Sequence, residues 1–164
     1  MTNLVNGNLA PEFRLKAFHG KEHSLQDLLS RGPTVLAFFK VSCPVCQFTF
    51  PFLQRLHERL GNANVTVVGI SQDDSRHTHQ FNEECGITFL TLIDPHPYPV
   101  SNAYGLTNVP TILLVEPDRT ITVSCIGFSK SDLEQIADNL QHRNKLAVHP
   151  LFRPDEIVPA YKPG

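Results

Sequence analysis

Two adjoining patterns of hydrophobic and polar positions, between residues 34 and 61, organise the interpretation of this chain. Residues 35–39 are an unbroken apolar run rich in β-branched and aromatic side chains, which is typical of a buried strand. After a short interruption, apolar side chains recur at every fourth position, at Phe48, Phe52, Leu56 and Leu60, with Val45 and Leu53 beside them. This second pattern predicts an amphipathic helix, which Gly61-Asn62 ends.

A second continuous apolar run, Val65–Ile70, follows this helix. Two buried strands joined by a helix favour a parallel βαβ unit with a right-handed crossover, so the predicted fold class is α/β. Further strands are predicted at Phe13–Ala17, near Glu22, at Phe89–Ile93, at Thr111–Glu116 and at Thr120–Ile126. Further helices are predicted over Leu25–Leu29 with Ser24 as the cap, from Asp74 or Ser75 to Gly86, over Val100–Tyr104, and over Leu133–Leu140 with Ser131 and Glu134 as a capping box.

Two short turns make the predicted sheet mixed rather than purely parallel. His19-Gly20-Lys21 separates the first two strands as an N-terminal hairpin, and Pro117-Asp118-Arg119 separates the last two. Strands joined by such short turns pair antiparallel. We therefore expect a central mixed sheet flanked by helices.

The chain changes character at Ala147. Four prolines exclude a helix beyond this point, namely Pro150, Pro154, Pro159 and Pro163. Five apolar side chains could still pack as an extended arm, namely Leu151, Phe152, Ile157, Val158 and Tyr161. We expect one domain over residues 1–146 and a proline-rich C-terminal tail over residues 147–164, docked or partly disordered.

Composition limits the partners that this chain can have. With 164 residues, 41% of them hydrophobic, it can bury the core of one domain. The net charge of -2 and the absence of a basic run argue against nucleic acid or an anionic membrane as a partner. No leading signal segment and no long apolar run are seen. We expect a cytoplasmic monomer, or a periplasmic or anchored protein if a signal segment has been removed.

Among the four cysteines, only Cys43 and Cys46 have a spacing with chemical meaning. The predicted strand delivers Cys43 to the start of the helix, where unpaired N–H groups and the helix dipole stabilise a thiolate. Pro44 suits the first helical position, which needs no N–H. Cys85 and Cys125 are isolated, so we interpret them as small apolar residues, and a four-ligand zinc site is not expected.

The order of these elements around Cys43-Pro44-Val45-Cys46 resembles the thioredoxin superfamily, over roughly Pro11 to Arg143. The N-terminal hairpin and the inserted helix and strand between Ser71 and Asp94 resemble its redoxin branch, the TlpA/ResA-like oxidoreductases related to AhpC/TSA peroxiredoxins. Pro51 stands where thioredoxins have a proline that kinks the same helix. Val109-Pro110-Thr111 resembles the cis-proline loop that faces the dithiol, so the resemblance implies a cis Pro110.

Two positions depart from the thioredoxin pattern. Thioredoxins have a buried Asp six residues before the first cysteine and a Trp directly before it, where this chain has Ala37 and Ser42. The usual proton acceptor for the second thiol is therefore missing. Lys40 could add positive potential near Cys43, although its stem more simply carries the ammonium group out to water.

The resemblance implies a thiol-disulfide oxidoreductase with antioxidant activity and a role in redox homeostasis, without a cofactor. Cys43 would attack the disulfide of a protein substrate, and Cys46 would resolve the mixed disulfide. The reverse sequence would oxidise a substrate dithiol. Cys46 would have a higher pKa than Cys43 because it is shielded. The segment Val109-Pro110-Thr111, with Pro44 and Val45, would bind the substrate. The electron donor and the physiological substrate are not readable from the sequence.

Two alternatives compete with this interpretation. A peroxiredoxin-like thiol peroxidase would place its peroxidatic cysteine at Cys46, but the preceding Thr or Ser is replaced by Cys43, the proline seven residues earlier by Phe39, and Thr111 stands where an Arg would be useful. A non-enzymatic, metal-binding thioredoxin-like module would need a histidine, such as His77, His79 or His96, beside the two cysteines. We expect these histidines to be solvated.

Overall fold

The computed structural model describes residues 4–164. The strands are β1 (Arg14–Ala17), β2 (Glu22–Ser24), β3 (Thr34–Phe39), β4 (Thr66–Ser71), β5 (Leu90–Ile93), β6 (Thr111–Val115), β7 (Ile121–Ile126), β8 (Phe128–Ser129) and β9 (Tyr161–Lys162). The helices are α1 (Leu25–Leu29), α2 (Pro44–Leu60), α3 (Ser75–Cys85), α4 (Pro99–Ala103) and α5 (Lys130–Arg143). The predicted elements are thus present, and β8 and β9 are additions that the sequence pattern did not predict.

One mixed sheet, in the order β2-β1-β5-β4-β3-β6-β7, forms the centre of the molecule. The central strand β3 pairs parallel with β4, with Phe39 opposite Ser71, and antiparallel with β6, with Thr34 opposite Val115. The predicted parallel βαβ unit and both predicted hairpins are confirmed, since β1 pairs with β2 and β6 with β7 in antiparallel register. This register brings the end of β3, where Cys43 follows, next to the end of β4 and the start of β6.

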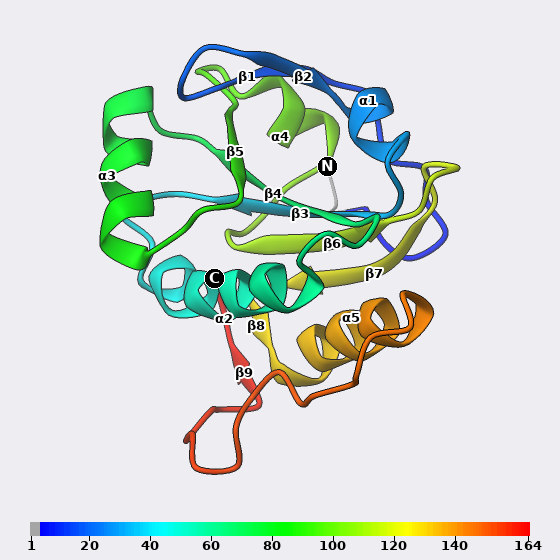
Figure 1. Ribbon diagram of the computed structural model, residues 1–164. Helices are drawn as coiled ribbons and strands as arrows, with labels where there is room; N and C mark the ends of the chain where they lie inside the picture. The colour runs from blue at the N-terminus through cyan, green and yellow to red at the C-terminus, as the bar shows by residue number, and fades with distance from the viewer. Residues whose placement is uncertain (1–3) are drawn as a thin grey trace.

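Helices cover both faces of this sheet, with α2 and α5 on one face and α1 and α4 on the other (Figure 1). Side chains of β3 alternate between the two sides, so Ala37 and Phe39 pack with α2 while Leu36 and Phe38 pack on the opposite face. All six residues of β3 are buried. This double burial explains why the strand reads as an unbroken apolar run rather than an alternating one.

The buried face of α2 differs from the predicted stripe. Its most buried apolar side chains are Cys46, Phe50, Leu53, Leu56 and Leu60. Phe50 packs between Phe39 and Phe81, with ring centroids 4.3 and 5.5 Å away. Phe48 and Phe52 are only partly buried and face Phe128 instead. The apolar surface of α2 is therefore wider than one stripe, because a second layer of side chains covers it.

The start of α5 corrects the predicted capping box. The N-cap is Ser129, whose hydroxyl accepts the backbone N–H of Asp132 at 3.3 Å. Ser131 lies within the first turn of the helix, so the predicted cap at Ser131 with Glu134 is wrong. Ser129 has the extended backbone that a cap needs because it also ends β8.

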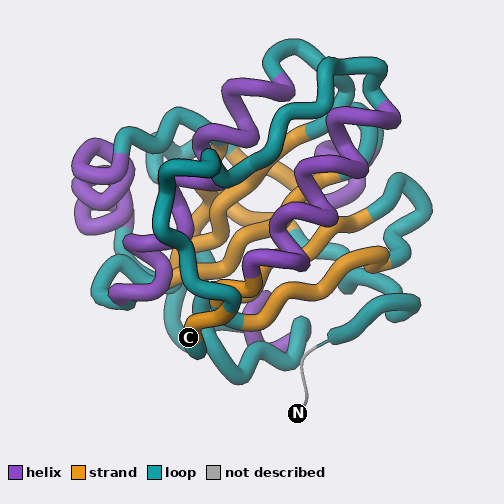
Figure 2. Tube along the Cα trace, turned by 90° about the horizontal axis from the view of Figure 1, so that it is seen from below, coloured by secondary structure: helices purple, strands orange, loops and turns teal. Residues whose placement is uncertain are grey.

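Residues 147–164 run over the face formed by α2 and α5 (Figure 2). Leu151 and Phe152 are buried in the core, and Phe152 stacks edge-on against Phe52 with ring centroids 4.8 Å apart. The expectation that Ile157 and Tyr161 also pack is wrong, because the side chain of Ile157 is fully exposed and that of Tyr161 is mostly exposed. Glu156, the residue before Ile157, is held against α2 by two hydrogen bonds from Arg55, at 2.7 and 2.9 Å.

Candidate active site

Cys43 is the N-cap residue of α2 and is partly exposed. Its backbone is extended, with φ -83° and ψ 115°, and Pro44 occupies the first turn. The sulfur accepts the backbone N–H of Cys46 at 3.2 Å. A side chain in this position receives an N–H that the helix itself leaves unpaired, and the positive end of the helix dipole favours negative charge on it. The start of α2 therefore holds the Cys43 sulfur through an N–H that has no partner within the helix.

Cys46 lies one helical turn further on and has no exposed surface. Burial is the main reason that the pKa of the Cys46 thiol is raised, and the contact with Cys43 raises it further. A hydrogen bond involving the backbone of Lys40 opposes this shift without cancelling it. The two cysteines thus differ in their surroundings: Cys43 is partly exposed, whereas Cys46 is shielded from solvent and the pKa of its thiol is raised.

The loop before β6 lies directly beside Cys43. The Val109–Pro110 peptide bond is cis, which confirms what the family resemblance implied. The thiol of Cys43 donates to the carbonyl oxygen of Val109 at 3.4 Å. Thr111 is buried, and its hydroxyl donates to the carbonyl of Asn108 at 2.7 Å, which helps to hold the conformation of this loop.

Two side chains that the sequence analysis missed hold the loop between β3 and α2. The carboxylate of Asp73 accepts the backbone N–H of Val41 at 2.8 Å, and the side-chain amide of Gln47 donates to the carbonyl of Val41 at 2.9 Å. Asp73 comes just after β4, whose end lies beside the end of β3. The predicted parallel pairing of these strands was the signal that could have placed Asp73 near the cysteines.

The remaining predicted site residues occupy varied places. Pro44 is exposed and Val45 is partly buried at the start of α2, and Pro51 is exposed within the same helix. Ala37 is fully buried in the core cluster that includes Cys46, so the position of the thioredoxin carboxylate is apolar here. Ser42 is exposed.

Lys40 is exposed and lines a cavity of about 190 Å³ together with Gln72, Leu106, Thr107, Asn108 and Val109. This cavity borders the cis-Pro110 loop, so it lies at the end of the sheet that carries the cysteines.

The other two cysteines lie apart from this pair. Cys125 is buried in β7, and burial raises the pKa of its thiol to about 12. Cys85 is partly buried at the end of α3. Within residues 4–164, no three or more His, Cys, Asp or Glu side chains are grouped so that they could hold a metal ion. His77 and His79 instead pair with Asp74 and Glu83.

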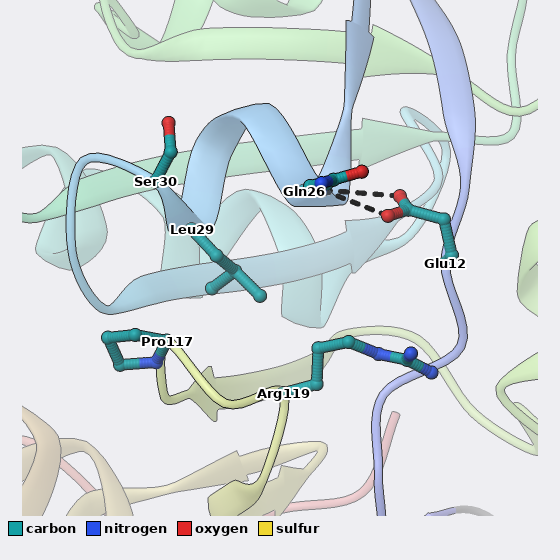
Figure 3. A pocket seen from close by; sticks show the side chains of 6 residues that line it. All are labelled: Glu12, Gln26, Leu29, Ser30, Pro117 and Arg119. Carbon is teal, nitrogen blue, oxygen red and sulfur yellow. Dashed lines mark hydrogen bonds between the residues drawn. The ribbon is translucent and has the colours of Figure 1, made fainter.

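A larger cavity has a volume of about 610 Å³, and Figure 3 shows the residues that line it. Glu12, Gln26 and Arg119 are among the residues that line it, and the carboxylate of Glu12 accepts the backbone N–H of Gln26 at 3.1 and 3.2 Å. Pro117, which also lines it, follows β6 at the end of the sheet where β3 begins. This cavity is therefore at the opposite end of the sheet from Cys43.

Comparison with known proteins shows that this chain is similar in sequence to two kinds of redox protein. The sequence pattern of the AhpC/TSA family matches residues 6–124. The thiol-disulfide oxidoreductase ResA of Geobacillus thermodenitrificans is 27% identical over 142 residues, 85% of this chain and 80% of the relative. Peroxiredoxin Bcp of Escherichia coli is 26% identical over 146 residues, 88% of this chain and 92% of the relative.

The fold matches solved structures of the thioredoxin type. The crystal structure of the thioredoxin domain of a thiol-disulfide oxidoreductase from Bacteroides vulgatus superposes with a TM-score of 0.73. The identity is 21%, and the match covers 84% of this chain and 98% of that domain. The predicted thioredoxin-like α/β fold is confirmed. No helix within residues 4–164 is both long enough and apolar enough to span a lipid bilayer.

Proposed function

Because this chain belongs to the AhpC/TSA family and is an oxidoreductase, we propose that it exchanges disulfides with protein substrates through Cys43 and Cys46. The observation that carries the proposal is the inequality of the two sulfurs. Cys43 is partly exposed and receives an N–H at the start of α2, whereas Cys46 is buried with a raised pKa one turn below. Dithiol enzymes need this division between an attacking and a resolving thiol.

The proposed reduction proceeds in two exchange steps. The Cys43 thiolate attacks one sulfur of a substrate disulfide, forming a mixed disulfide and releasing the other substrate sulfur as a thiolate that takes up a proton. Cys46 then loses its proton and attacks Cys43, which forms the Cys43–Cys46 disulfide and releases the second substrate thiol. Two electrons pass to the substrate. The reverse sequence oxidises a substrate dithiol.

The cis-Pro110 loop supports binding of an extended substrate segment. Val109 places its backbone carbonyl within 3.4 Å of the Cys43 sulfur, so a peptide that pairs with Val109 would bring its own sulfur to Cys43. Pro44 is exposed and Val45 is partly exposed directly after Cys43, and together they would offer apolar contact to a substrate.

The similarity to peroxiredoxin Bcp over most of that protein makes peroxide reduction the second candidate. In that reaction the peroxidatic thiolate would be Cys46, which must be reached by peroxide and must ionise readily. Cys46 has no exposed surface, and burial, Cys43 and Asp73 all raise its pKa. These properties suit a resolving thiol better than a peroxidatic one.

The test compares three cysteine variants in reduction of a protein disulfide. Cys43→Ser should abolish the activity, and Cys46→Ser should accumulate a mixed disulfide on Cys43 that mass spectrometry identifies. Cys85→Ser, which changes a partly exposed cysteine away from the pair, should retain full activity. Full activity in Cys43→Ser contradicts the proposal. Peroxide consumption that survives in Cys43→Ser and is lost in Cys46→Ser supports the peroxidase instead.

The direction of exchange follows from one number, the reduction potential of the Cys43/Cys46 pair. Related dithiols span from about -270 mV for reductants to about -120 mV for strong oxidants. Equilibration of the protein with glutathione buffers of known ratio, followed by quantitation of free Cys43, measures this potential.

A further inference from the structure

The segment Tyr161–Gly164, which we call the strap, lies against the cis-Pro110 loop beside Cys43. A β-carbon on Gly164 would overlap the carbonyl oxygen of Val109. The same oxygen accepts the thiol of Cys43 at 3.4 Å. The main chain of the strap is therefore in contact with the atom that lies next to the reactive sulfur.

The opposite side of the strap is packed equally closely against Gly127. A β-carbon on Gly127 would lie 2.5 Å from the carbonyl oxygen of Lys162 and 3.2 Å from the nitrogen of Gly164. Gly127 in turn donates its N–H to the carbonyl of Pro110 at 2.8 Å. The strap thus fills the narrow space between Gly127 and Val109 with backbone, and only glycine permits this approach from either side.

The contacts that hold the strap are few. β9 pairs antiparallel with β8 over two residues only, and the side chain of Tyr161 is mostly exposed. The ammonium group of Lys162 lies 4.7 Å from the ring centroid of Phe48, on the first turns of α2. A two-residue ladder and one cation–π contact are weak interactions on their own.

The residues before the strap are anchored far more firmly. Leu151 and Phe152 are buried, and the guanidinium of Arg55 forms two hydrogen bonds with the carboxylate of Glu156, at 2.7 and 2.9 Å. The firm anchor keeps the strap close to the site even when its own contacts break, which gives it a high effective concentration there. A weakly held segment that follows a firm anchor can leave the site and return.

We propose that the strap occupies the place where an extended segment of a protein substrate pairs with the cis-Pro110 loop, so that the chain competes with its own protein substrates. This inference rests on the proposed thiol-disulfide exchange through Cys43. Protein substrates need both the sulfur of Cys43 and the backbone of Val109, and the strap covers the latter. A small disulfide needs the sulfur alone, and Cys43 is partly exposed with the strap in place.

The expected effect follows from the population of the released state. When a substrate binds only the released form, its apparent affinity falls by the fraction of molecules in that form. Lys162→Ala removes the cation–π contact with Phe48, whose two residues are partly exposed. A contact of about 0.5–1 kcal/mol corresponds to about a two- to fivefold change in an equilibrium. Reduction of a protein disulfide should therefore become about two- to fivefold faster in this variant.

The experiment measures how fast the reduced chain, residues 1–164, reduces insulin and hydroxyethyl disulfide, which is small and uncharged. Gly164→Val is the second variant. The introduced valine side chain would clash with the backbone of Val109, and the substitution leaves the charge of the chain unchanged. Lys21→Ala is the control for charge, since Lys21 precedes β2 at the other edge of the sheet. Ile157→Ala is the control within the tail, because Ile157 is fully exposed.

The proposed competition by the strap is supported if Lys162→Ala and Gly164→Val both speed the reduction of insulin. Their rates with hydroxyethyl disulfide, and the rates of both control variants with either disulfide, should equal those of the wild-type chain. An insulin rate that is unchanged or slower in both strap variants overturns this proposal. If no form of the chain reacts with either disulfide, the proposed exchange itself has failed. In that case the rate of Cys43 alkylation tests whether the strap covers the site. The rate with a polymer-linked maleimide, divided by the rate with iodoacetamide, should rise in both variants. An unchanged ratio overturns the proposal that the strap competes with protein substrates.

Discussion

The backbone N–H of Cys46 points at the sulfur of Cys43 across 3.2 Å, which holds the two thiols one helical turn apart with only Cys43 near solvent. In the proposed cycle Cys46 must lose its proton before it can resolve the mixed disulfide, so the rate of this step depends on pH. Burial is the main cause of the raised pKa of Cys46. Below its pKa, the thiolate fraction of Cys46 rises with every increment of pH.

We therefore predict that the resolution rate increases about tenfold per pH unit between about pH 6 and pH 8, without a plateau. An aromatic disulfide that releases a coloured thiol separates the two steps, because attack by Cys43 releases the first equivalent and resolution by Cys46 the second. Cys46→Ser should lack the second phase. A second phase that levels off below pH 8 would contradict the raised pKa.

Ala37 offers a second prediction, because its side chain is fully buried in the cluster that contains Cys46. Ala37→Asp introduces a carboxylate at the position where thioredoxins have one. Burying an ionisable group in this apolar place should lower the free energy of unfolding by about 3 kcal/mol or more, measured by urea denaturation.

The same variant should speed resolution by Cys46, because the carboxylate can accept its proton. Ala37→Asn is the matched control: it carries a similar burial cost without a proton acceptor, so its resolution rate should stay at the wild-type value. Equal resolution rates in the Asp and Asn variants would show that Cys46 loses its proton by another path.

Phe152 and Ile157 form a matched pair of apolar residues within the tail. Phe152 is buried against Phe52 and Phe128, with ring centroids 4.8 and 5.7 Å away, whereas Ile157 is fully exposed. Phe152→Ala should cost about 3–5 kcal/mol in the free energy of unfolding, the usual range for a buried aromatic side chain. Ile157→Ala should change it by less than about 0.5 kcal/mol. Similar values for both variants in urea denaturation would mean that the tail does not dock as described.

The lowered pKa of Glu156 predicts that the folded state loses stability in acid. The hydrogen bonds from Arg55 are the main reason that the pKa of Glu156 is lowered to about 2 from its ordinary value of 4.5. A carboxylate with a depressed pKa stabilises the folded state above its ordinary pKa, and this contribution is lost as the pH falls through the folded-state value. The contribution of Glu156 should thus decline between about pH 4.5 and pH 2.

Thermal unfolding of Glu156→Gln across this pH range measures the effect. The melting temperature of the wild-type chain should exceed that of the variant at pH 6, and the difference should shrink as the pH approaches 2. Glu84→Gln, which removes an exposed carboxylate from α3, should show no comparable trend. A difference that stays constant with pH would contradict the depressed pKa of Glu156.

Much of the fold follows from local signals. The apolar run of β3 and the caps at Ser24, Cys43 and Asp74 act over a few residues, so they could be placed before the structure was known. The N-cap of α5 was misplaced because Ser129 and Ser131 are both good caps. Only the pairing of β8 with β9 fixes the extended backbone that selects Ser129.

The candidate site divides in the same way. By itself the sequence determined that an exposed and a shielded thiol stand at a strand-to-helix junction, because the spacing of Cys43 and Cys46 and the start of a helix are properties of neighbouring residues. The family resemblance added the cis-Pro110 loop. The tertiary structure alone decided that Asp73 holds the loop before Cys43, that Phe50 rather than Phe48 faces the sheet, and that the strap lies on Val109. These last contacts join segments tens of residues apart, and chain-distant contacts depend on how all the layers pack together, which no local pattern of hydrophobic and polar positions records.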